Sequence, residues 1–342
     1  MSDASNRLGG FKVLKGLTGF SVIYALEGHR PVAPLYRQLS EKRINLPFLV
    51  LENQGGSGGL QMVVETPDAL QTSRTLGVIS VQANHASGKK AILSLFPHRN
   101  DPHIAGALMQ ALGKNGISFD GLAHSQSAIS VVLDESALNR AASALFEPFR
   151  FGAYRTPADW KLAQEGKEEL LKEVVATYQE QRPKVYCLEW RDRLTLLQVM
   201  FQSSYGGAVG LIFEGLAELG FGLTFLITSP PRAEGEARML FCVHQAFEHH
   251  VISLTERWLP DAVTVETPSV ALFSMNGPHF GDRYGLVDEL LTAFDLAGVD
   301  LLAMSCSIAS MAGVVPSGQI QRATDAIRNR FEVPSVIHKD SS

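Results

Sequence analysis

The sequence predicts an α+β fold in which one β-α-β-β-α unit occurs four times. In the clearest unit, apolar and polar residues alternate over 117–120 and again over 129–134, as expected for two half-buried strands. A helix with apolar residues at helical spacing follows as far as Phe149. An apolar strand over 92–96 and a helix that begins at Asp101 precede them. This order of elements is typical of a ferredoxin-like unit that lacks only its last strand.

A second copy of this order lies near the C-terminus. It has a strand over 270–275 and a helix over 284–297. The segment 305–310 then corresponds to 124–129, and a last helix ends near Phe331. Because the repeat decides the fold, both halves of the chain are expected to contain such units.

Two more units follow from pattern alone. In the first, 11–17 and 20–26 are predicted as two strands, and a glycine-rich turn over 55–59 joins the next two. In the third, 185–190 and 193–199 are again predicted as two strands. The predicted arrangement is four ferredoxin-like βαββαβ units in two tandem pairs, with these bounds: unit 1, 1–84; unit 2, 85–152; linker helix, 153–183; unit 3, 184–262; unit 4, 263–334; tail, 335–342.

Two helix starts carry capping residues. Asp134 is a suitable N-cap for the helix that ends the second unit. Thr156 and Asp159 form a capping box at the start of the linker helix, and Gly166 allows a bend within it. The linker is interpreted as a spacer helix packed on the neighbouring sheets, with a lever between the two pairs as the alternative.

The segment His124–Leu133, followed by a helix that ends in Phe149, resembles the C-terminal ACT domains of aspartokinases. The segment Ser305–Val315, followed by 330–333, resembles the same family. The resemblance implies that one unit of each pair is nested in the other, with an early strand completing the later sheet. It also implies that an amino acid such as lysine or threonine binds between the loop before a unit's first helix and the strand after it.

Composition and charge narrow the class of protein. The net charge of −5 and the pI near 6.1 give no electrostatic reason to expect nucleic acid. No apolar run of about 18 residues is present, and the N-terminus has no signal-peptide core, so no membrane association is expected. Three widely spaced cysteines indicate reduced thiols. A cytoplasmic protein is therefore expected.

Few residues suggest catalysis. The segment His244–His250 places His244 and Glu248 four residues apart, but without an HExxH motif or a cysteine pair, so exposed polar residues are preferred over a metal site. The glycines over 55–59 lack the Gly-Lys-Ser/Thr ending of a phosphate loop, and Cys306 is predicted to be a buried thiol. No nucleotide loop or kinase domain of the aspartokinase type is recognised. No cofactor, metal or catalytic residue is therefore expected, and the chain is predicted not to be an enzyme.

The candidate binding residues lie around the first helix of units 2 and 4. Backbone N–H groups at a helix start suit a ligand carboxylate, and a carboxylate on the next strand suits an ammonium group. Simple turns and helix caps are the alternative. The candidates are Asn100, Asp101, His103, Ile104, Ala105, Ser118, Phe119 and Asp120 in unit 2, and Gly281, Asp282, Arg283, Tyr284, Gly285, Val299 and Asp300 in unit 4.

The function expected from the sequence is non-catalytic. The chain would be a regulatory protein that binds a small amino acid of the lysine or threonine type between its units and transmits this binding allosterically. The expected partners are that amino acid, a second copy in a homodimer, and a biosynthetic enzyme. The alternatives are a ligand-free regulatory or structural subunit of an aspartokinase-like complex, and an enzyme with an unrecognised site between units.

Overall fold

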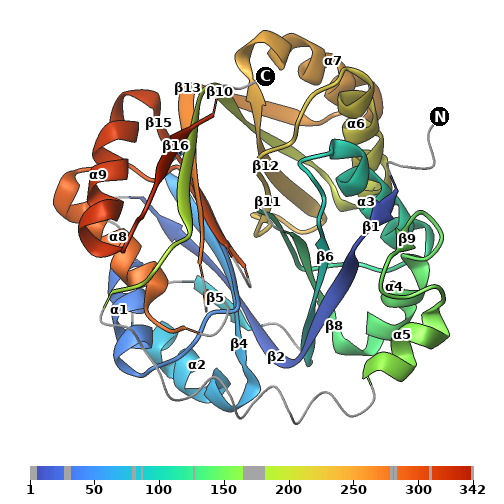
Figure 1. The fold of residues 1–342 in the computed structure, drawn as a ribbon, viewed down its shortest axis with the longest axis horizontal. Helices are drawn as coiled ribbons and strands as arrows, with labels where there is room; N and C mark the ends of the chain where they lie inside the picture. The colour runs from blue at the N-terminus through green and yellow to red at the C-terminus, as the bar shows by residue number, and fades with distance from the viewer. Residues whose placement is uncertain are drawn as a thin grey trace.

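Two layers of β-strands face each other, and helices cover the outer face of each layer (Figure 1). The structure is a computed structural model that describes residues 6–26, 32–78, 82–85, 88–125, 128–164, 182–277, 280, 283–307 and 310–339. The mixed composition of helices and strands confirms the coarse fold class expected from the sequence.

The first half of the chain contains the following elements: β1 (Arg7–Leu8), β2 (Gly10–Ala25), α1 (Ala33–Glu41), β3 (Phe48–Gln54), β4 (Ser57–Glu65), α2 (Ala69–Val78), β5 (Gln82–His85), β6 (Lys90–Phe96), α3 (Pro102–Lys114), β7 (Gly121–His124), β8 (Ile129–Asp134), α4 (Leu138–Ala144), β9 (Arg150–Phe151) and α5 (Pro157–Gln164). The second half contains β10 (Cys187–Gln202), α6 (Gly206–Glu218), β11 (Leu226–Ser229), β12 (Glu236–His244), α7 (Glu248–Trp258), β13 (Val263–Asn276), α8 (Leu286–Ala297), β14 (Ala303–Ser307), β15 (Ser310–Pro316), α9 (Ile320–Arg330) and β16 (Val336–His338).

The strands pair in the same antiparallel order four times. The four groups of neighbouring strands are β5-β2-β4-β3, β2-β6-β8-β7, β13-β10-β12-β11 and β10-β13-β15-β14. In each group the strand that begins the β-α-β-β-α segment is central and pairs on one side with the third strand of that segment. On its other side lies the strand that follows the segment in the first and third groups, β5 or β13, and an earlier strand in the second and fourth, β2 or β10. This is the strand order of a ferredoxin-like sheet.

Each half contains a long strand near its start that serves two groups, and in the second half β13 also belongs to two groups. The start of β2 pairs with β6 and its end pairs with β4; likewise, the end of β10 pairs with β12 and its start with the end of β13. The expectation of two separate strands at each place is therefore wrong. Gly16 (φ 71°) and Arg193 (φ 55°) lie at register shifts, where the strand bends without ending.

Two pairings join the halves of the chain. Strand β7 pairs with β11, where His124 lies opposite Leu226, and β3 pairs with β14, where Leu49 lies opposite Cys306. Because β12 also pairs with β10, the large sheet closes on itself. Sequence periodicity carries no information on these long-range pairings.

Three separate cores follow from this closed sheet. One lies beneath α3, α4, α6 and α7, and a second lies beneath α1, α2, α8 and α9. The third fills the space between the two strand layers with side chains such as Phe48, Ile92, Phe225 and Leu272. Successive strand residues point to opposite faces, so most strands contribute to two cores.

The connecting segments match the expectations in part. The capping box is confirmed: the Asp159 N–H donates to Thr156 Oγ1 at 3.2 Å and the Thr156 N–H donates to Asp159 Oδ2 at 3.0 Å. Helix α5 begins there, but 165–181, which include the expected bend at Gly166, lie outside the described residues. The last residues add β16 beside the start of β10. No helix among the described residues is long and apolar enough to cross a membrane.

Candidate ligand-binding cleft

Helices α3 and α6 pack closely and antiparallel because both carry glycine at the contact. A Cβ atom added at Gly106 would lie 2.7 Å from the carbonyl oxygen of Gly210, and one added at Gly210 would lie 2.7 Å from that of Gly106. A Cβ added at Gly113 would lie 3.2 Å from the Cα of Gly207, so the end of α3 lies beside the start of α6. A cleft opens at this end of the helix pair, where Gly113 and Gly207 are both part of its wall.

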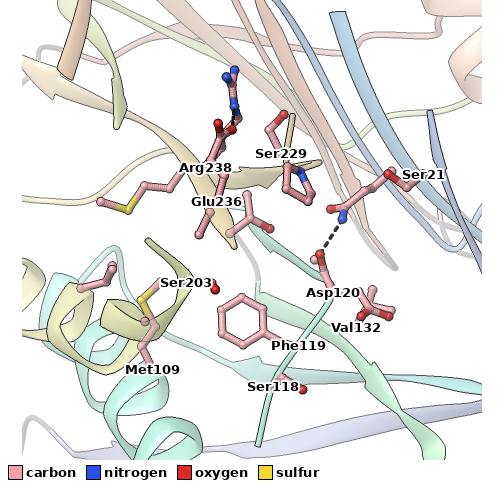
Figure 2. A pocket seen from close by; sticks show the side chains of 18 of the residues that line it. Ser21, Met109, Ser118, Phe119, Asp120, Val132, Ser203, Ser229, Glu236 and Arg238 are labelled. Carbon is pink, nitrogen blue, oxygen red and sulfur yellow. Dashed lines mark hydrogen bonds and ion pairs between the residues drawn. The ribbon is translucent and has the colours of Figure 1, made fainter. Parts of the chain in front are cut away.

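A cavity of about 790 Å³ opens where the end of α3 meets the start of α6. Residues from β2, β3, β4, β7, β8, β10, β11 and β12 and from the segment 116–120 contribute to the rest of its wall. Figure 2 shows Phe119 in the middle of this cleft, with Met109 and Ser203 on one side and Glu236 on another. The volume falls within the range of about 300–1,000 Å³ that is usual for small-molecule sites.

Asp120 lines the cleft and is already paired with a lysine. Its Oδ2 lies 2.6 Å from Nζ of Lys90, which lies 2.7 Å from Oδ1 of Asp134. Burial alone would lower the pKa of Lys90, but the hydrogen bonds and negative charges of the two aspartates outweigh this effect and raise it. Asp134 therefore binds Lys90 and makes no side-chain cap, contrary to the expectation of a helix cap. Gln61 Nε2, on β4, donates to the backbone oxygen of Asp120 at 2.5 Å and so links β4 to the residue directly before β7.

The opposite wall carries a second ion pair. Arg238 donates to Glu236, which also accepts from the backbone N–H of Arg232 at 3.2 Å. Partial burial would raise the pKa of Glu236, but Arg238 and the Arg232 N–H outweigh it and lower the pKa. Both acidic residues of the cleft wall are thus compensated by basic partners.

A buried charge cluster lies directly behind this wall. Glu52 on β3 is 1% exposed and accepts hydrogen bonds from Arg232 and, at 2.9 Å, from Ser229 Oγ. Arg232 also donates to the carbonyl oxygen of Gly58 at 2.7 Å. Burial raises the pKa of Glu52, and the Arg232 charge and the Ser229 hydrogen bond offset only part of that rise. The cluster ties the β11–β12 loop to the first half of the chain.

The residues expected to form the unit 2 site are divided between the two ends of α3. Ser118, Phe119 and Asp120 line the cleft. Asp101 caps the far end of α3 by accepting from the His103 N–H at 2.9 Å, which confirms the helix start expected there. Ile104 and Ala105 are buried in the core.

The far end of α3 is closed by contacts within the chain. The carbonyl oxygen of Asn100 accepts from the Leu223 N–H at 2.8 Å. The His103 ring contacts Glu214 through Nδ1 and Asn6 Oδ1, at 2.8 Å, through Nε2. The cavity opens at the opposite end of the helix pair, where the end of α3 lies beside the start of α6.

The residues expected in unit 4 do not surround a comparable cavity. Arg283 and Gly285 line a space of only about 10 Å³ before α8, and Tyr284 lies between them in sequence. Val299 is buried, and the exposed Asp300 accepts from Gln319 Nε2 at 2.8 Å. Gly281 and Asp282 lie outside the described residues.

The cleft also contains residues that sequence reasoning missed. They lie in the segment before and at the start of α6 and on β12: Ser203, Ser204, Gly206, Gly207, Glu236 and Arg238. The signal was present for the first four, because they occupy the loop before the first helix of unit 3. The same rule that selected residues in units 2 and 4 would have selected them.

Comparison with solved structures places this geometry in a known fold. A crystal structure of aspartate kinase from Synechocystis matches with a TM-score of 0.79 and 15% identity, over 95% of this chain and 56% of that chain. The regulatory subunit of aspartate kinase from Thermus flavus matches at 17% identity with a TM-score of 0.39, over 43% of this chain and 98% of that one. Aspartokinase III from E. coli, in complex with aspartate and ADP, matches at 14% identity with a TM-score of 0.34, over 45% and 35%. No family model and no curated protein matches the chain.

The Synechocystis match shows an aspartate-kinase-like fold and corrects the functional expectation. The structure that matches 95% of the chain is that of an aspartate kinase. The prediction of a kinase-free, non-catalytic regulatory protein is therefore wrong, and so is the prediction that the chain is not an enzyme. The chain spans about half the length of the Synechocystis enzyme.

Proposed function

We propose that this chain belongs to an aspartate-kinase-type enzyme and binds a small molecule of the amino-acid type in the cleft beside α6. The observation that carries the proposal is the cavity of about 790 Å³ between the start of α6 and residues 118–120. In this proposal the four β-α-β-β-α segments are ACT-type units. The segments that contain α3 and α6 form the binding pair.

The chemistry of the wall supports a ligand with both a negative and a positive group. Ser203 and Ser204 provide hydroxyl groups at the start of the helical segment that leads into α6, where backbone N–H groups and the helix dipole favour a carboxylate. Asp120, whose side chain is 47% exposed despite its contact with Lys90, can accept from an ammonium group. An amino acid carries both groups.

A blocking substitution tests this site. A Cβ atom added at Gly207 would meet no heavy atom within 4 Å, so Gly207→Leu should fold and place its side chain in the cleft. A thermal-shift screen of the twenty amino acids, followed by isothermal titration, should identify a ligand whose binding Gly207→Leu abolishes. A ligand at 100 times its Kd would stabilise the chain by about 2.7 kcal/mol.

Gly77→Leu is the matched control. Gly77 also lies in a helix with no heavy atom within 4 Å of an added Cβ, but it does not line the cleft. Binding should survive in this variant. If no amino acid binds the native chain, or if Gly207→Leu binds as tightly as the native chain, the proposed site is wrong.

The enzymatic part of the proposal needs a separate assay. ADP release from ATP should be measured with and without aspartate, and with and without the amino acid found in the screen. Aspartate-dependent turnover that responds to this amino acid in the native chain, but not in Gly207→Leu, would support both parts. If no aspartate-dependent turnover occurs, the enzymatic part fails for this chain, and binding is judged by the titration.

Two of the partners expected from the sequence, a second copy of the chain and a biosynthetic enzyme, are part of this proposal. A homodimer is proposed because the start of β13 pairs only on one side and exposes Val263 and Val265 along that edge. Light scattering at tens of micromolar should give the mass of two chains, and a monomer with and without ligand would contradict this. A biosynthetic enzyme is the other proposed partner.

A further inference from the structure

The charges around the cleft limit the ligand that it can hold. Among the described residues that line it, the acidic side chains are Asp120 and Glu236. Lys90 contacts Asp120 at 2.6 Å and is itself only 6% exposed, so it cannot readily turn away into solvent. Arg238 holds Glu236 from the other side. One carboxylate thus faces Lys90 and the other faces Arg238.

The partners favour the charged forms of Lys90 and Glu236. The pKa of Lys90 is raised and that of Glu236 is lowered by their partners, although burial opposes each shift. The exposed part of Asp120 is assigned to the ligand's α-ammonium group, so a second cation on the side chain would have to compete with Lys90 or Arg238 for a carboxylate. Transfer of such a charge into the cleft without a free partner is unfavourable.

The remaining wall suits an apolar group. Phe119 and Phe201 are half-buried and contribute aromatic rings, and Met109, Met239 and Val209 lie in the wall as well. Figure 2 shows the Phe119 ring facing the side of the cleft that carries Met109 and Ser203. Aromatic and thioether groups adapt to extended apolar ligands.

We propose that the cleft binds an amino acid with a long, uncharged, apolar side chain, in preference to the lysine or threonine type expected from the sequence. This inference rests on the proposed function, because it concerns the same cleft. It assigns Phe119 and Phe201 as the residues that select the side chain, while the existing ion pairs exclude a cationic one.

Norleucine and lysine form the sharpest pair of probes because they differ only by the terminal ammonium group. Isothermal titration of the native chain should give a Kd at least tenfold lower for norleucine than for lysine. Equal binding, or tighter binding of lysine or threonine that Gly207→Leu abolishes, would overturn this inference and leave the proposed function intact. If none of the amino acids binds, both fail.

A second variant tests the assigned contact. Phe119→Ala removes a half-buried ring at the surface of the cleft, so the fold should survive, as circular dichroism would show. The Kd of norleucine should rise about tenfold, while that of lysine should change less than threefold. An unchanged norleucine Kd, or an equal loss for both ligands, would contradict the selection of the side chain by Phe119.

Discussion

Substitution of Gly210 by alanine should destabilise the chain, although alanine is normally favoured over glycine in a helix. The added Cβ atom would lie 2.6 Å from Cγ of Gln110 and 2.7 Å from the carbonyl oxygen of Gly106. The side chain of Gln110 can move, but the backbone of α3 at Gly106 cannot move without separating the two helices. The contact is therefore overpacked.

The magnitude follows from two opposing effects. Overpacking a tight contact costs about 1–3 kcal/mol. Replacing glycine by alanine in a helix gains about 0.5–1 kcal/mol. We therefore expect Gly210→Ala to lower the free energy of unfolding by about 1–2 kcal/mol.

Gly207→Ala, three residues earlier in the same helix, is the matched control. An added Cβ there meets no heavy atom within 4 Å, so only the gain in helix propensity remains, about 0.5 kcal/mol. Urea unfolding followed by circular dichroism should show midpoints that move in opposite directions, with similar m-values. If Gly210→Ala is as stable as Gly207→Ala, the close contact of α3 with α6 is not the one described here.

Three further results are expected. Glu52→Ala should lower the free energy of unfolding by about 3 kcal/mol at pH 7, because it leaves the largely buried Arg232 and Ser229 without their shared acceptor; an effect below about 1 kcal/mol in urea unfolding would contradict this. Burial raises the pKa of Glu52 above its ordinary value of 4.5, so the folded chain binds more protons than the unfolded chain between these two pKa values. The native chain should thus gain stability relative to Glu52→Ala as the pH falls from 7 toward 4.5, and a gain on raising the pH would refute the sign. Lys90→Met should change the free energy of unfolding by less than about 1 kcal/mol, because Asp120 and Asp134 are about half exposed. It should also bring the Kd of lysine closer to that of norleucine. An unchanged ratio of these two Kd values would show that Lys90 does not exclude cations.

Local structure was predictable where the sequence carries a local signal. Periodicity indicated the helices and most strands, and Asp101 and the Thr156–Asp159 box marked two helix starts correctly. The breaks predicted at 18–19 and 191–192 were wrong, because the nearby Gly16 and Arg193 are bulge positions within a single strand. In the structure the chain continues through a bulge at both positions, since neighbouring strands on both sides of the bulge hold the long strand extended.

The site was predictable only in part, since it depends on residues far apart in sequence. Residues 118–120 were among the candidates, but Lys90, which neutralises Asp120, is 30 positions earlier and was not considered, because the predicted apolar strand began at residue 92. The pairing of β7 with β11 places Thr228 and Ser229 beside them. No periodic pattern encodes which edge strands meet, because any two exposed edges offer the same backbone groups.

The shared strands β2 and β10 have a consequence for how such a chain can be inherited. The sheet that contains β6, β7 and β8 is completed by the start of β2, and the sheet that contains β14 and β15 is completed by the start of β10. A gene fragment that encoded one unit alone would leave another unit without a strand. Duplication or loss should therefore act on the pair as its smallest piece, and the two halves of this chain, each with a long shared strand near its start, have the form that duplication of a pair would leave.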